Sequence, residues 1–256
     1  MLNSLTSELD IMRPSLLESG LEVLNYNINR KQQDLKIYEI GNIYAQDGIG
    51  KYKQASKVGI WITGNVQQQH WEQAAKKADV FYLKGIVELI LQLCGAHKYQ
   101  LDITPEQIVY KRGKDILATI EQISNQKLKS FDIKQQVFYA SIDVEILVQI
   151  AEQAKTQYKE LPKFPNTKRD LAVVVDKSIS YQQLIATVQK QKIDGLVNYD
   201  LFDIFESDKI GNDKKSLALS FTFQLTDKTL TDVEVDAKIQ QIIQALEQGL
   251  QATIRS

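Results

Sequence analysis

The fold is decided by the stretch Ser216-Leu217-Ala218-Leu219-Ser220-Phe221-Thr222-Phe223, in which large apolar and small side chains alternate strictly. A period of two is typical of a β-strand with one buried face. The opposite face carries only serine, alanine and threonine side chains. Such a face is either solvated or receives a flat partner, and the neighbouring segments distinguish these cases.

These neighbouring segments predict the element order β-α-β-β-α-β. Two helices are expected to begin with reciprocal capping sequences, S-x-x-Q at Ser180 and T-x-x-E at Thr231. Strands are expected at residues 171–175, 197–205, 216–223 and 252–255. This order is that of the ferredoxin-like unit, in which both helices cover one face of a four-stranded sheet and leave the other face free.

Strand alternation then predicts which side chains lie on the free face. The leucines and phenylalanines of residues 216–223 are expected to point inward, together with Phe202 and Ile204 on the preceding strand. The side chains expected on the free face are Ala172, Leu201, Asp203, Phe205, Ser216, Ala218 and Arg255. An aromatic ring, an arginine and small polar groups on one sheet are typical of a platform for single-stranded RNA.

Other uses of the same fold remain open on pattern alone. Ferredoxin-like domains also serve as protein-interaction or dimerisation scaffolds and as small-molecule sensors. From Lys163 onward the chain has 12 basic and 13 acidic residues, so a broad grip on phosphates is not indicated. Any RNA contact here is therefore expected to be local and directed at bases.

The C-terminal part resembles the ferredoxin-fold anticodon-binding domain that ends the β subunit of bacterial phenylalanyl-tRNA synthetases. The resemblance implies that Ala172, Asp203, Phe205, Ser216 and Arg255 bind the anticodon. Many family members have tyrosine at the position of Phe205, so this chain keeps the stacking ring and lacks the hydroxyl. The blocks that carry the resemblance are residues 163–165, 168–176, 201–205, 210–211, 214–218, 223–224, 229–235 and 252–255.

Upstream, residues 2–5, 12–17, 27–30, 37–41 and 81–88 resemble the synthetase-like module that precedes that domain. The chain departs from the family at residues 110–113, where Tyr-Lys-Arg-Gly replaces a frequent His-Pro-Gly, and it lacks a Gly-rich turn at 121–128. The implied fold class is α+β: a class II synthetase-like antiparallel-sheet module at residues 1–155, a linker at 156–162, and a ferredoxin-like βαββαβ domain at 163–256. The candidates for contact with tRNA or another subunit outside the anticodon site are Arg13, Arg30 and Arg169.

The N-terminal part predicts mixed helices and strands. Ser15 with Glu18 is expected to cap a helix that carries Leu17, Leu21, Leu24 and Ile28 on one side. Residues 35–44 and 58–63 alternate as strands. Residues 79–94 predict a largely buried helix, with Lys84 and Glu88 as an i,i+4 ion pair.

No catalytic residue is predicted. A synthetase core needs cations to neutralise the triphosphate of ATP, but residues 35–44 include Glu39 and no arginine, and no later Gly-rich turn is followed by arginine.

His70 and His97 are isolated, so no metal site is expected. The single cysteine, Cys94, is expected to be a buried structural thiol in a reducing compartment. No apolar stretch reaches membrane-spanning length and no signal peptide is evident, so a cytoplasmic location is expected.

The resemblance therefore implies a piece of a longer β chain. In the whole enzyme, expected to be an α2β2 heterotetramer, the α subunit would use ATP and Mg²⁺ to attach phenylalanine to tRNA(Phe). This piece would support the α subunit and read the anticodon. It is expected to bind no cofactor itself and to be inactive alone.

Overall fold

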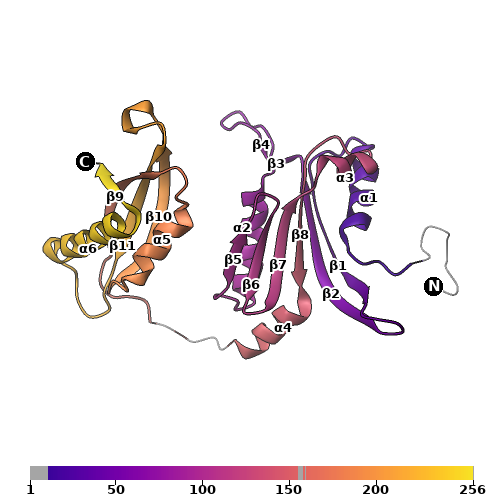
Figure 1. Cartoon of the computed structure of the whole chain (residues 1–256), viewed down its shortest axis with the longest axis horizontal. Coiled ribbons are helices and arrows are strands. Elements are labelled where there is room, and N and C mark those ends of the chain that lie inside the picture. The colour runs from indigo at the N-terminus through magenta and orange to yellow at the C-terminus, as the bar shows by residue number, and fades with distance from the viewer. Residues whose placement is uncertain (1–10, 155–157, 159, 256) are drawn as a thin grey trace. The chain divides into compact units, whose positions relative to one another are not determined.

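The computed structural model describes residues 11–154, 158 and 160–255. The chain forms two compact units, Met1–Thr156 and Gln157–Ser256 (Figure 1). The resemblance at residues 2–5 lies outside the described residues, as do positions 156, 157 and 159 of the expected linker. In the described part, no helix is long and apolar enough to cross a membrane.

The first unit is built on a six-stranded antiparallel sheet with the strand order β1-β2-β8-β7-β6-β5. The expected strands at 35–44 and 58–63 are present as parts of a longer hairpin. The strands are β1 (Leu35–Gln46), β2 (Tyr52–Thr63), β5 (Gln100–Ile103), β6 (Gln107–Arg112), β7 (Asp115–Gln122) and β8 (Val137–Asp143), with a small ribbon of β3 (Asn65–Gln67) and β4 (Lys76–Lys77).

Helices cover both faces of this sheet. The helices α1 (Leu17–Ile28) and α3 (Asn125–Ser130) share an apolar cluster with Trp61. The helices α2 (Val80–Leu93) and α4 (Val144–Gln153) share another with Ile60 and Ile62. Neighbouring residues of β2 thus point into different cores, as the period of a strand requires.

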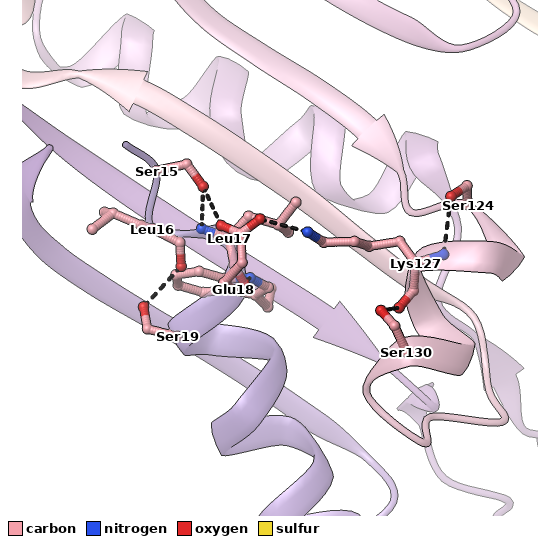
Figure 2. A network of polar contacts seen from close by, with 9 residues as sticks. Ser15, Leu16, Leu17, Glu18, Ser19, Ser124, Lys127 and Ser130 are labelled. Atoms are coloured by element: carbon pink, nitrogen blue, oxygen red, sulfur yellow. Dashed lines mark hydrogen bonds and ion pairs between the residues drawn. The ribbon is translucent and has the colours of Figure 1, made fainter. Parts of the chain in front are cut away.

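The beginning of α1 differs from the expected cap at Ser15. The Ser15 hydroxyl accepts a hydrogen bond from the Leu17 amide at 3.0 Å and donates one to Glu18 at 2.6 Å, and the helix begins only at Leu17. Glu18 also accepts from Lys127 of α3 at 2.6 Å (Figure 2). Burial alone would raise the pKa of Glu18, but the hydrogen bonds from Lys127 and Ser15 outweigh it and lower that pKa. The serine and glutamate therefore join α1 to α3 instead of closing a reciprocal cap.

Helix α2 begins as its sequence indicates. The Asp79 side chain accepts from the Tyr82 amide at 2.7 Å, and the expected ion pair between Lys84 and Glu88 is present at 2.6 Å. The prediction of a largely buried helix is wrong, because Phe81 and other apolar residues of α2 face solvent. One stripe is buried, formed by Leu83, Val87 and Leu91. Cys94, the C-cap residue, is partly exposed.

The second unit has the predicted β-α-β-β-α-β order. Its four-stranded antiparallel sheet has the order β10-β11-β9-β12, which is ferredoxin-like. Both predicted capping boxes, at Ser180 and Thr231, are present. The elements are β9 (Thr167–Asp176), α5 (Tyr181–Lys190), β10 (Leu196–Phe205), a 3₁₀ turn (Asp208–Ile210), β11 (Lys214–Phe223), α6 (Asp232–Leu250) and β12 (Thr253–Arg255).

The alternation in β11 packs as predicted. Both helices contribute apolar residues to the core on this face, including Leu184 of α5 and Ile242 of α6. In the described part of the chain, no helix packs on the opposite face of the sheet, which we call the free face. The inward residues of β11 are all fully buried: Leu217, Leu219, Phe221 and Phe223.

A β-bulge in β10 corrects part of the predicted orientation. Leu201 pairs with the inward Leu219, and Asp203 pairs with Ala218, so Phe202 is an extra residue without a partner. Leu201 therefore packs on the core and Phe202 is 57% exposed, the reverse of the expectation. The bulge resets the alternation, so Asp203 and Phe205 still lie on the free face.

Candidate nucleic-acid interface

The strand register gathers the five predicted anticodon residues on the free face. They occupy two adjacent rows that run across the sheet, and these two rows together are called the platform below. The first row is Asp203, Ala218, Ala172 and Arg255, and the second is Phe205, Ser216, Val174 and Thr253.

Arg255 and Phe205 meet across the platform. The guanidinium carbon of Arg255 lies 5.2 Å from the centre of the Phe205 ring, although β12 and β10 are opposite edge strands. This distance is that of a cation–π contact. Because Ala172 and then Ala218 follow Arg255 in its row, the long side chain can extend over short ones.

Ser216 is shielded from solvent for the most part, even though it belongs to the free face. Ser216 is only 4% exposed, whereas Phe205, its partner on β10, is 44% exposed. We attribute this shielding to the Phe205 ring and the Arg255 guanidinium near it.

Asp203 offers an exposed carboxylate at the edge of the platform. Within the described residues, it takes part in no ion pair and no side-chain hydrogen bond. Next to the platform, Asp200 and Asp170 lie opposite Ser220 on the same face. Carboxylates accept hydrogen bonds from base N–H groups and repel phosphates, so this surface suits bases better than the nucleic-acid backbone.

The three further arginine candidates lie elsewhere and contact their own chain. Arg13 forms an ion pair with Glu39 at 2.6 Å and donates to the Asn42 carbonyl at 2.9 Å, along the edge of β1. Arg30 lies with its guanidinium carbon 3.4 Å from the centre of the Tyr26 ring.

Arg169 pairs with Asp232 and Asp236 of α6. The structure thus places none of the three arginines on the platform. Their contact with tRNA or another subunit stays a prediction.

Sequence reasoning missed two platform residues, Val174 and Thr253. Val174 has the same strand parity as Ala172, so the alternation of β9 could have located it. It is 8% exposed and lies beside Ser216 in the second row.

Among the residues that the structure describes, no group of three or more His, Cys, Asp or Glu side chains could hold a metal ion.

Comparison with known sequences matches nearly all of this chain. Residues 1–144 match the family described as phenylalanyl tRNA synthetase beta chain CLM domain, and residues 162–255 match the ferredoxin-fold anticodon binding domain. Among solved structures, a pyrrolysyl-tRNA synthetase from Desulfitobacterium hafniense aligns with 55% of this chain and 50% of its own at 16% identity and a TM-score of 0.44, which is too low to support an assignment.

Phenylalanine–tRNA ligase β subunits are among the curated relatives of this chain. That of Bacteroides fragilis is 33% identical over 100% of this chain and 33% of its own length. That of Porphyromonas gingivalis is 31% identical with the same coverage. The chain thus spans about a third of the length of these relatives. It belongs to the phenylalanine–tRNA ligase β subunit family.

Proposed function

We propose that this chain is the C-terminal part of a phenylalanine–tRNA ligase β subunit and that its platform reads the anticodon of tRNA(Phe). Residues 1–155 form the synthetase-like module, 156–162 the linker and 163–256 the anticodon reader. The observation that carries the proposal is the register that aligns Asp203, Ala172 and Arg255 in one row beside Phe205 and Ser216.

Each side chain has a distinct role in this proposal. The exposed face of the Phe205 ring stacks on one base, and the Asp203 carboxylate accepts a hydrogen bond from a base N–H. Ala172 leaves room for a flat base close to the sheet. As the base enters, Arg255 leaves its place near the Phe205 ring, and the Ser216 hydroxyl beside that ring is available to a base edge.

The first unit supports the α subunit in an α2β2 enzyme of the cytoplasm. It has an apolar groove of about 380 Å³ between the edge strand β1 and helix α2, where Tyr38 is 74% and Ile40 is 65% exposed. An exposed apolar surface of this kind is typical of subunit contacts.

Catalysis belongs to the α subunit, which uses ATP and Mg²⁺. Strand β1 carries Glu39 and no arginine, and the nearby Arg13 is held by that glutamate. Phenylalanylation is therefore expected only when the longer β chain and the α subunit are both present. Full activity of this chain with the α subunit alone would contradict the proposal.

Binding to an isolated anticodon stem-loop tests the reading role. Phe205→Ala and Asp203→Ala are expected to weaken the binding of the tRNA(Phe) stem-loop, with a loss of about 1–3 kcal/mol for a stacked base. Phe202→Ala is the matched control, since this exposed phenylalanine lies in the bulge outside both rows. Equal affinities of all three folded variants would contradict the proposal and favour a dimerisation scaffold.

A further inference from the structure

The first unit contains a basic pocket of about 330 Å³ where α2 and α4 end. Figure 1 shows both helices ending toward the same end of the sheet. The residues that carry charge or polarity in its lining are His97, Lys98, Arg112 and Gln153. No carboxylate is among the lining residues, although acidic residues outnumber basic ones in the chain, 32 to 31.

The lysine and the arginine of this pocket, Lys98 and Arg112, have no acidic partner in the described part of the chain. Neither Lys98 nor Arg112 takes part in an ion pair there, whereas the adjacent Lys111 is paired with Asp102 at 2.7 Å. The charges of Lys98 and Arg112 therefore remain available to a ligand. They come from separate segments, the loop after α2 and the end of β6, so the fold brings them together.

The cations are also not needed to cap the two helices. The Ala96 and Gly95 amides donate to the Leu91 and Gln92 carbonyls of α2 at 2.8 and 3.0 Å. The Ala154 amide donates to the Ile150 carbonyl of α4 at 2.9 Å. Each helix end carries only about half a negative charge, so two full cations leave the pocket attractive to anions.

Two lining residues of the pocket, Gly95 and Ala154, pack closely against each other. Gly95 has φ +81°, and a Cβ atom added there would lie 2.6 Å from the Cβ of Ala154. The chain turns next to the pocket at Gly113, with φ +64°, which places Lys114 after Arg112 at the tip of the β6–β7 hairpin. Asp115 is the partner of Arg112 in the strand register of this hairpin, but it forms no ion pair with Arg112 and is not among the lining residues.

We propose that this pocket binds phosphate groups, with Arg112 and Lys98 as the charged ligands and His97 and Gln153 as further hydrogen-bonding groups. An arginine fork matches phosphate oxygens and a lysine adds a point charge. The phosphate can come from an RNA backbone or from a small phosphate ester. The site lies in a different unit from the platform, so it does not depend on anticodon reading.

The first experiment measures how binding of a blunt RNA duplex of about 16 base pairs depends on salt, using the whole chain. Such a duplex has no single-stranded bases, so Phe205→Ala is expected to leave its binding unchanged. In the variant Lys98→Gln/Arg112→Gln the slope of log K against log salt should become shallower by about one for each cation removed. The control Lys31→Gln/Lys51→Gln makes the same change in charge at exposed positions of the same unit.

The second experiment titrates the whole chain with inorganic phosphate and with ribose 5-phosphate and follows backbone amide signals by NMR. Shifts at Gly95 and Ala96 that disappear in Lys98→Gln/Arg112→Gln would support the site. If these shifts occur but the salt dependence of RNA binding is the same in the wild type and in Lys98→Gln/Arg112→Gln, the natural ligand is a small phosphate ester. If the pocket and control variants behave alike in both experiments, the proposal is overturned, even where the pocket variant unfolds more easily.

Discussion

The guanidinium of Arg255 rests 5.2 Å from the centre of the Phe205 ring, although the two residues lie on opposite edge strands of one sheet. Between them the sheet carries Ala172, Ala218 and Ser216, which are short enough for the arginine to extend over them. The two groups proposed to contact bases therefore contact each other in the free protein.

A double-mutant cycle measures that contact. Arg255→Met and Phe205→Leu are expected to show a coupling free energy of about 0.5–1 kcal/mol, because the pair is partly solvated. Urea unfolding of the four proteins, followed by amide signals of the second unit, gives the value. Strictly additive effects would mean that the ring and the guanidinium do not interact in solution.

The bulge in β10 predicts opposite sensitivities for two adjacent residues. Leu201→Ala removes a side chain packed on the core and should destabilise the second unit by about 1–3 kcal/mol. Phe202→Ala changes an exposed side chain and should stay within about 0.5 kcal/mol of the wild type. Chemical denaturation checks both. A larger loss of stability in Phe202→Ala than in Leu201→Ala would mean that β10 alternates regularly and has no bulge at Phe202.

The bulge also shows what local pattern can and cannot predict. The alternation of β11 and the capping sequences at Ser180 and Thr231 depend on near neighbours, so the sequence predicted them correctly. The orientation of Leu201 and Phe202 was predicted wrongly, because the extra residue is defined by pairing with Leu219 and Ala218, some 15 to 18 positions away in the chain. Pairing between distant strands leaves no signature in one strand alone.

Packing around Trp61 predicts that alanine, although a good helix former, destabilises helix α1 when it replaces Gly20. A Cβ atom at Gly20 would lie 2.1 Å from the buried Trp61 ring, so Gly20→Ala should destabilise the first unit by roughly 1–3 kcal/mol. At Gly85 of α2 nothing lies within 4 Å of the added atom, so Gly85→Ala should stabilise by about 0.5–1 kcal/mol. Unfolding followed by tryptophan fluorescence compares the two. Stabilisation by both would mean that α1 does not pack against Trp61.

The cap of α6 predicts a pH dependence. Glu234 accepts from Lys228 and from the Thr231 amide, and these interactions lower its pKa to about 2. Because the folded-state pKa is lowered, the stabilisation is complete above the ordinary value near 4.5 and is lost as pH falls toward 2. An NMR titration of the Glu234 carboxyl carbon should show a midpoint near 2.

Glu234→Gln provides the comparison for this cap. In the wild type, protection of the first α6 amides against hydrogen exchange should fall below pH 4.5, and in the variant this fall should be absent. A wild-type midpoint at the ordinary glutamate value would show that the cap does not hold in solution.

The residues of the candidate site could be predicted from the sequence, but the contacts that their side chains make with one another in the free protein could not. Parity placed Ala172, Asp203, Phe205, Ser216 and Arg255 on one face, and the register agrees for each. The contact between Arg255 and Phe205 was not predictable, because it arises where side chains from β10 and β12 meet over β11. That these five residues bind the anticodon stays a prediction.

The most direct test of anticodon reading is a cycle that changes the protein and the RNA together. Dissociation constants are measured for the wild type, Phe205→Ala and the control Phe202→Ala, each with tRNA(Phe) and with the same tRNA carrying another anticodon. The wild type and Phe202→Ala should prefer tRNA(Phe), and Phe205→Ala should lose about 1–3 kcal/mol of binding to tRNA(Phe) and with it most of the preference. A wild type that binds both tRNAs equally, or a preference unchanged in Phe205→Ala, would contradict the role of the platform.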